Sequence, residues 1–262
     1  VENFDSVVAA IGAASISRVY IDNITANVDA SDSSLLIKFV SPNPNTTYDD
    51  IYITNVNADI LFGQNDESST ALVCNNLVLE NVVANSVDLT TYDFRNTKIL
   101  NSSITDLNIE STNVAVVSGN KFVRAKFGAF SVDKNLYDLK FVDNVVDSGA
   151  SSFNGEVMYA VPETATLAFS DVAGFQLGLF GNVKRVTISS NSVITDDSLP
   201  YGAGLFISNQ INHTGGDFSD LIISDNTIAQ IDLGNTDNRH GIVIFPQIDD
   251  SLATYGRWSI LN

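Results

Sequence analysis

Acidic side chains in the C-terminal half of the chain have the types and spacing that acid–base catalysis requires. Asp196 and Asp197 follow Asn191 by five and six residues, and Ile231 and Asp232 follow Asn226 by the same intervals. Glycoside hydrolysis needs two carboxyl groups, about 5–5.5 Å apart for retention or about 6.5–9.5 Å apart for inversion. Crowded carboxylates also differ in pKa, which gives an acid beside a base. If the two segments lie side by side, Asp196, Asp197 and Asp232 are the candidate catalytic residues.

A second group of candidates surrounds His240, one of only two histidines. His240 could abstract a proton, and with its neighbour Arg239 it could hold an acidic sugar. Aromatic rings stack on sugar rings, and several lie in or near the longer turns. We therefore predict His240 as a fourth catalytic residue and the following as substrate-binding residues: Arg239, Asp237, Tyr201, Tyr159 and Trp258. The alternative is that the polar residues are solvated turn residues and that some of the aromatic residues cover the core.

A short repeat supplies the elements that would position these residues. Apolar residues alternate, polar residues follow, and the unit ends in Asn. The Asn lies two positions after the last apolar residue in early copies and three positions after it in later copies; these residues are Asn23, Asn55, Asn81 and Asn101, then Asn120, Asn144, Asn191 and Asn226. Alternation predicts strands, and Asn tolerates the left-handed conformation of a bend. Stacked Asn amides can also form a ladder.

The spacing of the repeat predicts a stack of coils. Between Asn144 and Asn191 the step of 47 residues is about twice the usual one, so we expect a further unit at 167–171 to fill it. Residues 204–207 match 241–244, so each coil holds at least two strands. Long inserts are expected at 27–50, 148–166, 195–203, 208–220, 229–240 and 246–257, with the functional groove in the C-terminal half. The segment 258–262 opens another unit, and we expect a C-terminal portion to be missing.

The first residues have a different pattern. Phe4, Val7, Val8 and Ile11 fall on one face of a helix, after the possible N-cap residues Asp5 and Ser6. We therefore predict a short capping helix within residues 1–16 and a stack of coils over 17–262. An ordinary surface helix would give the same pattern.

The units resemble the coils of right-handed parallel β-helices of the pectate-lyase-like superfamily, most clearly at 186–194 and 221–228. The opening residues 5–11 resemble the capping helix of bacteriophage tailspikes. The resemblance implies an all-β fold, a right-handed parallel β-helix of about 9–11 irregular coils. It also implies a homotrimer with further domains that binds bacterial surface polysaccharide, on a virion or outside the cell. The leucine-rich repeat is the competing fold, but its Asn spacing and its helices fit less well.

The composition of the chain excludes several classes of partner and site. The formal net charge is −18, and 13 Lys plus Arg cannot form the basic face that nucleic acid requires. The single cysteine, Cys74, excludes an internal disulfide and a multi-cysteine metal site, and we expect it to be a buried thiol. No apolar run approaches the roughly 18 residues of a membrane span. We expect no metal, no cofactor and no membrane insertion.

Three functions remain open from the sequence. The first is a tailspike-type β-helix that binds and depolymerises a bacterial surface polysaccharide. The second is a non-catalytic structural or adhesive rod. The third is a free pectin-type lyase or hydrolase. Asp196-Asp197 and His240-Gly241 match only parts of the pectin-hydrolase motifs, because Arg239 stands where Gly is expected and no Arg-x-Lys follows.

Overall fold

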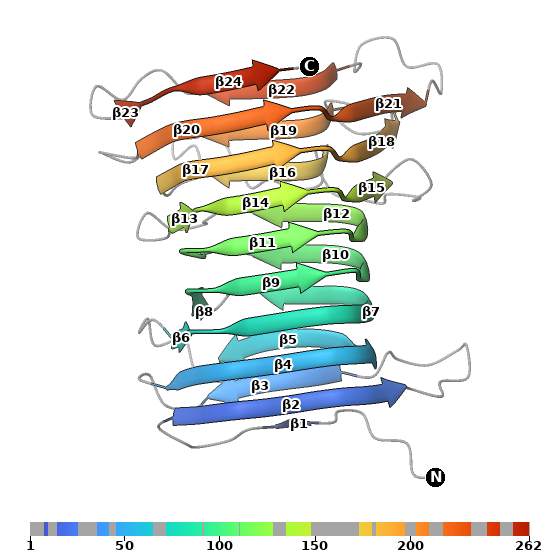
Figure 1. The fold of residues 1–262 in the computed structure, drawn as a ribbon, viewed down its shortest axis with the longest axis vertical. Helices are drawn as coiled ribbons and strands as arrows, with labels where there is room; N and C mark the ends of the chain where they lie inside the picture. The colour runs from blue at the N-terminus through green and yellow to red at the C-terminus, as the bar shows by residue number, and fades with distance from the viewer. Residues whose placement is uncertain are drawn as a thin grey trace, which may run out of the picture.

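The chain folds into parallel β-strands that wind upward in successive coils (Figure 1). The computed structural model describes residues 8–9, 15–25, 36–41, 46–64, 72–90, 92–109, 111–127, 135–147, 173–179, 182–196, 203–209, 217–231, 240–246 and 254–261. All strands belong to one curled sheet, and every pairing among them is parallel. This arrangement is consistent with a parallel β-helix.

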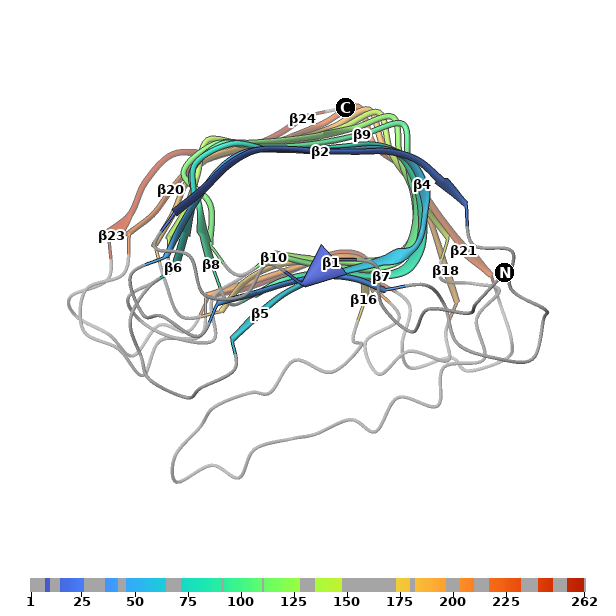
Figure 2. The same ribbon diagram turned by 90° about the horizontal axis from the view of Figure 1, so that it is seen from below.

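Two ladders of strands form the opposite walls of the stack, as the view along its axis shows (Figure 2). The front ladder runs through β2 (Ser15–Thr25), β4 (Thr47–Asn57), the start of β7 (Leu77–Leu89), β9 (Thr97–Leu100), β11 (Ala115–Ser118), β14 (Leu139–Val142), β17 (Asn182–Ser189), β20 (Asp217–Ser224) and β24 (Trp258–Leu261). The back ladder runs through β1 (Val8–Ala9), β3 (Leu36–Ser41), β5 (Asp59–Gln64), the end of β7, β10 (Ser103–Ile109), β12 (Lys121–Phe127), β16 (Ala173–Leu179), β19 (Ala203–Asn209) and β22 (His240–Pro246).

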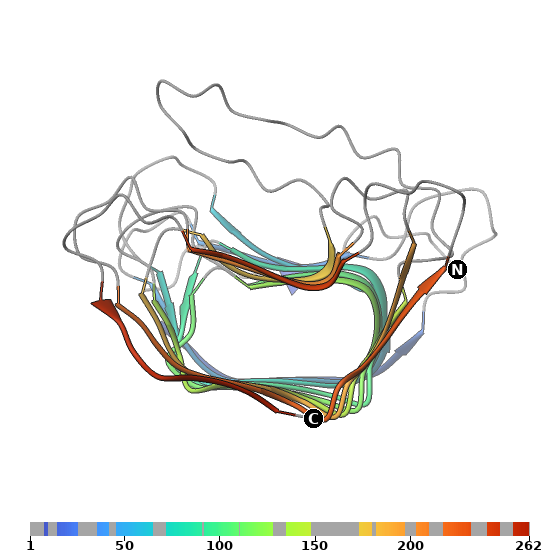
Figure 3. The same cartoon turned by 90° about the horizontal axis from the view of Figure 1, so that it is seen from above.

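Shorter strands lie at the two sides of the stack, and those of the last coils spread outward from those of the earlier coils (Figure 3). One side carries β15 (Val145–Asp147), β18 (Ser192–Asp196) and β21 (Thr227–Ile231). The other carries β6 (Leu72–Cys74), β8 (Tyr92–Phe94), β13 (Asn135–Tyr137) and β23 (Thr254–Tyr255). The matched segments 204–207 and 241–244 are neighbours in the back ladder, as the repeat predicted.

The core fills the space between the walls. Alternation places every second side chain of a front strand inward, so that equivalent residues form columns along the stack. One such column contains Ile53, Leu79, Ile99, Val117, Phe141 and Ile188, all fully buried. Aromatic rings pack between the lower coils, where Phe39 stacks on Phe62 with ring centroids 4.4 Å apart. Phe141 belongs to this core, as predicted, whereas Phe169 lies outside the described residues.

The two Asn spacings of the repeat correspond to two neighbouring positions in one bend. Asn23, Asn55, Asn81 and Asn101 have φ between 51° and 57°, in the left-handed region. In the later coils Gly119, Asp143, Ser190 and Asp225 take this position, and the residue after each is a buried or half-buried Asn. Those asparagines form the ladder. For example, Asn144 Oδ1 accepts from the backbone N–H and the Nδ2 of Asn120, both at 3.0 Å.

The first residues do not form the helix that the sequence predicts. Val8 and Ala9 form strand β1 and pair with Ile37 and Lys38 of β3, so the capping helix predicted within residues 1–16 is not seen. The pattern at positions 4, 7, 8 and 11 is misleading because a β-branched residue such as Val8 can instead complete a ladder. The remainder of 1–14 lies outside the described residues.

The step of 47 residues is one coil, not two. Asn144 donates through its backbone N–H directly to Asn191 Oδ1 at 2.9 Å, and Lys140 pairs with Thr187. No coil can intervene in the front ladder between strands that are hydrogen-bonded to each other, and residues 167–171, where a further unit was expected, lie outside the described residues. Likewise, the insert expected over 27–50 contains β3 and the start of β4. The described residues contain no helix, which removes the support for a leucine-rich repeat.

Candidate functional site

The outward side of the front ladder is a regular surface that extends over nine strands. We call it the flat face and define it by two outward positions on each strand. In β2 to β24 order, the first position holds Tyr20, Tyr52, Val78, Lys98, Val116, Lys140, Thr187, Ile222 and Ser259. The second holds Asp22, Thr54, Glu80, Leu100, Ser118, Val142, Ser189, Ser224 and Leu261. All of them are exposed or half-buried.

The flat face is electrically neutral although the chain is strongly acidic. Asp22 and Glu80 are its two acids, and Lys98 and Lys140 are its two bases, so their formal charges sum to zero, against −18 for the whole chain. The remaining side chains are hydroxyl-bearing or apolar. Such a surface loses little hydration energy when a neutral, hydroxyl-rich ligand covers it.

Two tyrosines stand at the N-terminal end of the flat face. Tyr20 of β2 and Tyr52 of β4 are register partners, and their rings stack with centroids 4.9 Å apart and an interplanar angle of 5°. Tyr20 is 70% exposed, the largest value among the exposed large hydrophobic residues. Tyr20 belongs to the first described strand of the front ladder, so its ring packs on one neighbouring ring, that of Tyr52.

A carboxylate lies beside the two rings. Asp22 shares the outward side of β2 with Tyr20, and it accepts hydrogen bonds from Asn23 Nδ2 (2.6 Å), Thr54 Oγ1 (2.7 Å) and Asn55 Nδ2 (2.8 Å). The hydrogen bonds from Thr54 and then Asn55 lower the pKa of Asp22 below its ordinary value. Asp22 is therefore an ionised and oriented acceptor at neutral pH.

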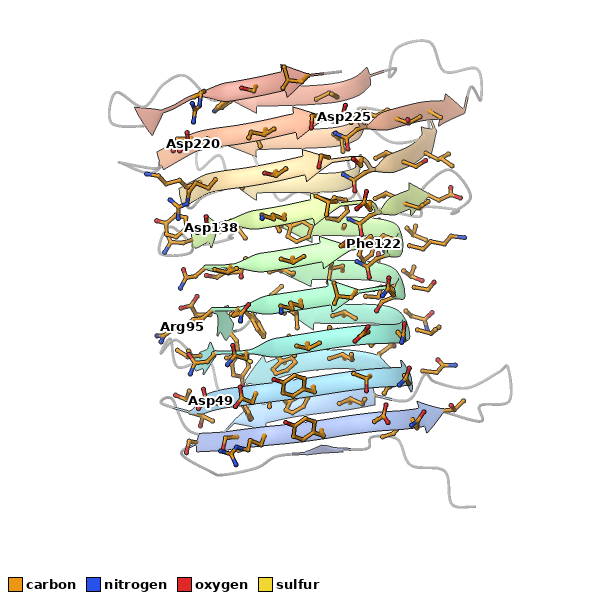
Figure 4. All side chains as sticks on the ribbon, in the orientation of Figure 1. Asp49, Arg95, Phe122, Asp138, Asp220 and Asp225 are labelled. Carbon is orange, nitrogen blue, oxygen red and sulfur yellow. The ribbon has the colours of Figure 1, made fainter. Side chains whose placement is uncertain are left out.

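A row of alternating charges, which we call the charge ladder, runs along the edge of the front ladder at which its strands begin. Asp138, Arg185, Asp220 and Arg257 occupy equivalent positions in four successive coils, and Figure 4 shows Asp138 and Asp220 at the same edge of the stack. Arg185 donates to both oxygens of Asp138 at 2.6 and 2.8 Å, and Arg257 lies 3.4 Å from Asp220. The hydrogen bonds from Arg185 lower the pKa of Asp138. Because these groups are well exposed, the ladder contributes little stability.

Most of the predicted catalytic and substrate-binding residues lie outside the described residues. These are Asp197, Asp232, Asp237, Arg239, Tyr159 and Tyr201. Asp196 is the last residue of β18 and pairs with Ile231, the last residue of β21. The register counted from Asn191 and Asn226 is thus observed up to the residues that precede Asp197 and Asp232. His240 opens β22 and pairs with Ala203.

Trp258 and Cys74 both contribute to the interior. Trp258 pairs with Leu221 in a core-facing column and packs against the core, away from the flat face. Cys74 is a buried free thiol, as expected, and burial raises its pKa to about 12. The residues predicted to bind substrate do not include Tyr20 and Tyr52, although the sequence carries a signal for outward rings at these positions. Each is the polar-tipped residue between two apolar ones in consecutive repeats, which predicts an outward ring.

The described parts of the chain contain no group of three His, Cys, Asp or Glu side chains that could hold a metal ion. Within the same residues, no helix is long and apolar enough to cross a membrane. Comparison of the chain with protein-family descriptions, curated proteins and solved structures finds no match. A function therefore has to be inferred from the surface of the described residues.

Proposed function

We propose that the chain forms a right-handed parallel β-helix that binds a bacterial surface polysaccharide, as the rod of a phage tailspike or a similar appendage on a virion or outside the cell. The observation that carries this proposal is the neutral flat face on a chain of net charge −18. Nine strands spaced about 4.8 Å apart give this face a length of about 38 Å. A linear polymer can contact many equivalent positions along such a face.

The chemistry of the flat face suits a neutral glycan. Hydroxyl side chains such as Ser118, Thr187 and Ser189 can exchange hydrogen bonds with sugar hydroxyls. Apolar side chains such as Val116 and Val142 can pack against the C–H faces of sugar rings. A polyanionic glycan would be repelled by the net charge of the chain at low salt.

A retention assay tests this proposal. The full-length protein is immobilised, and capsular and O-antigen polysaccharides are passed over it. Thr187→Glu adds a charge to the middle of the flat face and should weaken retention about tenfold, because the charge must be desolvated under a neutral ligand. Asn108→Glu adds the same charge on the outward side of the back ladder and should bind like the wild type. The proposal fails if the wild type retains no polysaccharide, or if both variants bind equally.

Depolymerisation is the second candidate function. The pairing of Asp196 with Ile231 favours it, because Asp197 and Asp232 are the residues that follow in the chain. Incubation with the retained polysaccharide, followed by size-exclusion chromatography, distinguishes the alternatives. Shortening that disappears in Asp197→Asn supports these carboxylates as catalytic, and shortening that persists moves the site elsewhere. Retention without shortening identifies a non-catalytic rod, and cleavage of galacturonan would indicate the pectin-type enzyme.

The proposed appendage is a homotrimer. Light scattering of the intact protein at several concentrations checks this, and a stable monomer would count against the tailspike interpretation.

A further inference from the structure

We infer that Tyr20, Tyr52 and Asp22 form a subsite for one neutral pyranose ring at the N-terminal end of the flat face. This inference rests on the proposed polysaccharide binding and names one place and one ligand class for it. It differs from the carboxylate site predicted in the C-terminal half, because it lies in the first two coils of the front ladder.

The ring of Tyr20 is held in place before any ligand arrives. Its partner Tyr52 stacks on it at 4.9 Å and belongs to the next strand of the front ladder, and Tyr52 is itself only partly exposed. Because the ring is already ordered, a ligand that covers it does not have to immobilise a free side chain. Tyr20 is 70% exposed, so part of its ring surface is available for burial under a ligand.

Asp22 supplies a hydrogen-bond acceptor at a suitable distance. Residues two apart in a strand share a side of the sheet and are separated by about 7 Å, which matches the reach of a sugar whose ring lies on Tyr20. Asp22 Oδ1 already accepts from Thr54 and Asn55, and Oδ2 accepts from Asn23. A carboxylate has about four lone-pair positions. One position on Oδ2 therefore remains for a sugar hydroxyl, and the side chain is exposed to receive it.

The charges around the subsite select the ligand class. Asp22 is ionised, and Glu80 lies in the same outward column two strands further along. A phosphate or a uronate placed on Tyr20 would meet both carboxylates, and it would be repelled. A neutral hexose offers a C–H face to the ring and hydroxyl donors to Asp22, so the arrangement fits this class.

The test uses full-length protein with ¹³C-labelled tyrosine and neutral methyl hexopyranosides, together with their linear oligosaccharides, as probes. Saturating oligosaccharide should shift the ring resonances of Tyr20 and Tyr52 and leave those of Tyr137 unchanged. Tyr20→Phe keeps the ring and should bind like the wild type. Tyr20→Ala should weaken binding about tenfold, and Asp22→Asn should also weaken it. Tyr137→Ala is the matched control at an aromatic position outside the flat face.

The outcomes separate this inference from the proposed function. If the polysaccharide is retained equally by the wild type and Tyr20→Ala, the subsite is wrong and the function stands. If the sugar probes shift Tyr20 but no polysaccharide is retained, the subsite stands and the function is wrong. Absence of any shift at Tyr20 with every probe overturns the subsite. Sedimentation that shows Tyr20→Ala dissociating an oligomer would assign the exposed ring to a contact between copies, which also overturns it.

Discussion

Replacement of Asn144 by Ala should strongly destabilise the stack, because one side chain completes the hydrogen bonding of four groups on three neighbouring residues. Asn144 Oδ1 accepts from the backbone N–H and the Nδ2 of Asn120, and Asn144 Nδ2 donates to the carbonyl oxygen of Val117 at 2.9 Å and to Asn191 Oδ1 at 3.1 Å. Asn144 is 1% exposed, so water cannot replace these partners easily. Four hydrogen bonds at about 1 kcal/mol each give a loss of about 4 kcal/mol.

Urea denaturation followed by circular dichroism measures this loss, and amide hydrogen exchange locates it. The N–H of Asn120 should lose protection first, because its acceptor is gone. Asn101→Gly is the matched control, since Asn101 is exposed in the left-handed conformation (φ 51°) of the neighbouring bend position. Glycine adopts that conformation freely, so this change should cost less than about 1 kcal/mol.

An intermediate variant sharpens the test. Ser102 occupies the ladder position three coils before Asn191, and its Oγ accepts from the N–H of Val82 at 3.0 Å and donates to the carbonyl oxygen of Leu100 at 2.8 Å. Asn144→Ser should therefore keep part of the bonding and lose about 2 kcal/mol. A loss under about 1 kcal/mol in Asn144→Ala with the N–H of Asn120 still protected would contradict this role of Asn144. Equal losses of stability in Asn144→Ser and Asn144→Ala would contradict it as well.

Three further predictions concern single side chains. Thr97 Oγ1 is fully buried without a hydrogen-bond partner, so Thr97→Val should raise the free energy of unfolding by about 1 kcal/mol. Thr112→Val should lower it, because Thr112 Oγ1 donates to a carbonyl oxygen at 3.0 Å. Urea denaturation of the two variants measures both changes. Cys74, with a pKa of about 12, should resist a thiol reagent at pH 8 in the native state and react once the chain is unfolded in urea; rapid native labelling would contradict its burial. The pKa of Asp138 is lowered in the folded chain, so the contribution of Asp138 to stability is present above its unfolded pKa and is lost as pH falls through its folded pKa. Arg185→Gln should raise the pKa of Asp138 in a carboxyl NMR titration. An unchanged pKa would exclude the ion pair as the cause of the lowered value.

The strands of the front ladder could be predicted from the sequence because each carries a complete alternation. In Ile51-Tyr52-Ile53 and Leu77-Val78-Leu79 the outer residues are buried and the middle one is not. The sequence also predicts an Asn ladder and shows two Asn spacings, but it does not show that they correspond to two different positions of the bend. Only the backbone shows that Asn101 and Gly119 share a left-handed position while Asn120 points inward.

The predicted capping helix and the predicted extra coil are both wrong, for two physical reasons. A helical apolar pattern of four residues, such as that around Val8, cannot outweigh a ladder of hydrogen bonds to a strand distant in sequence. Coil length is also invisible to the repeat, since a coil of 47 residues closes on the same register as one of 18. The catalytic candidates Asp197 and Asp232 lie outside the described residues and stay predictions, whereas the flat face follows from the register of the described strands.

The Asn ladder gives the stack a direction. The side chain of Asn144 bonds the backbone N–H of Asn120 and the carbonyl oxygen of Val117, and both of these groups belong to the coil before it. Asn191 does the same for Asn144 and Phe141. Each bend is thus left with an open amide until the following coil has wound onto it. A ribosome delivers coils in this order, so the tip of the growing rod would present this bend amide, together with the unpaired groups of its last strand, to the coil that is synthesised next.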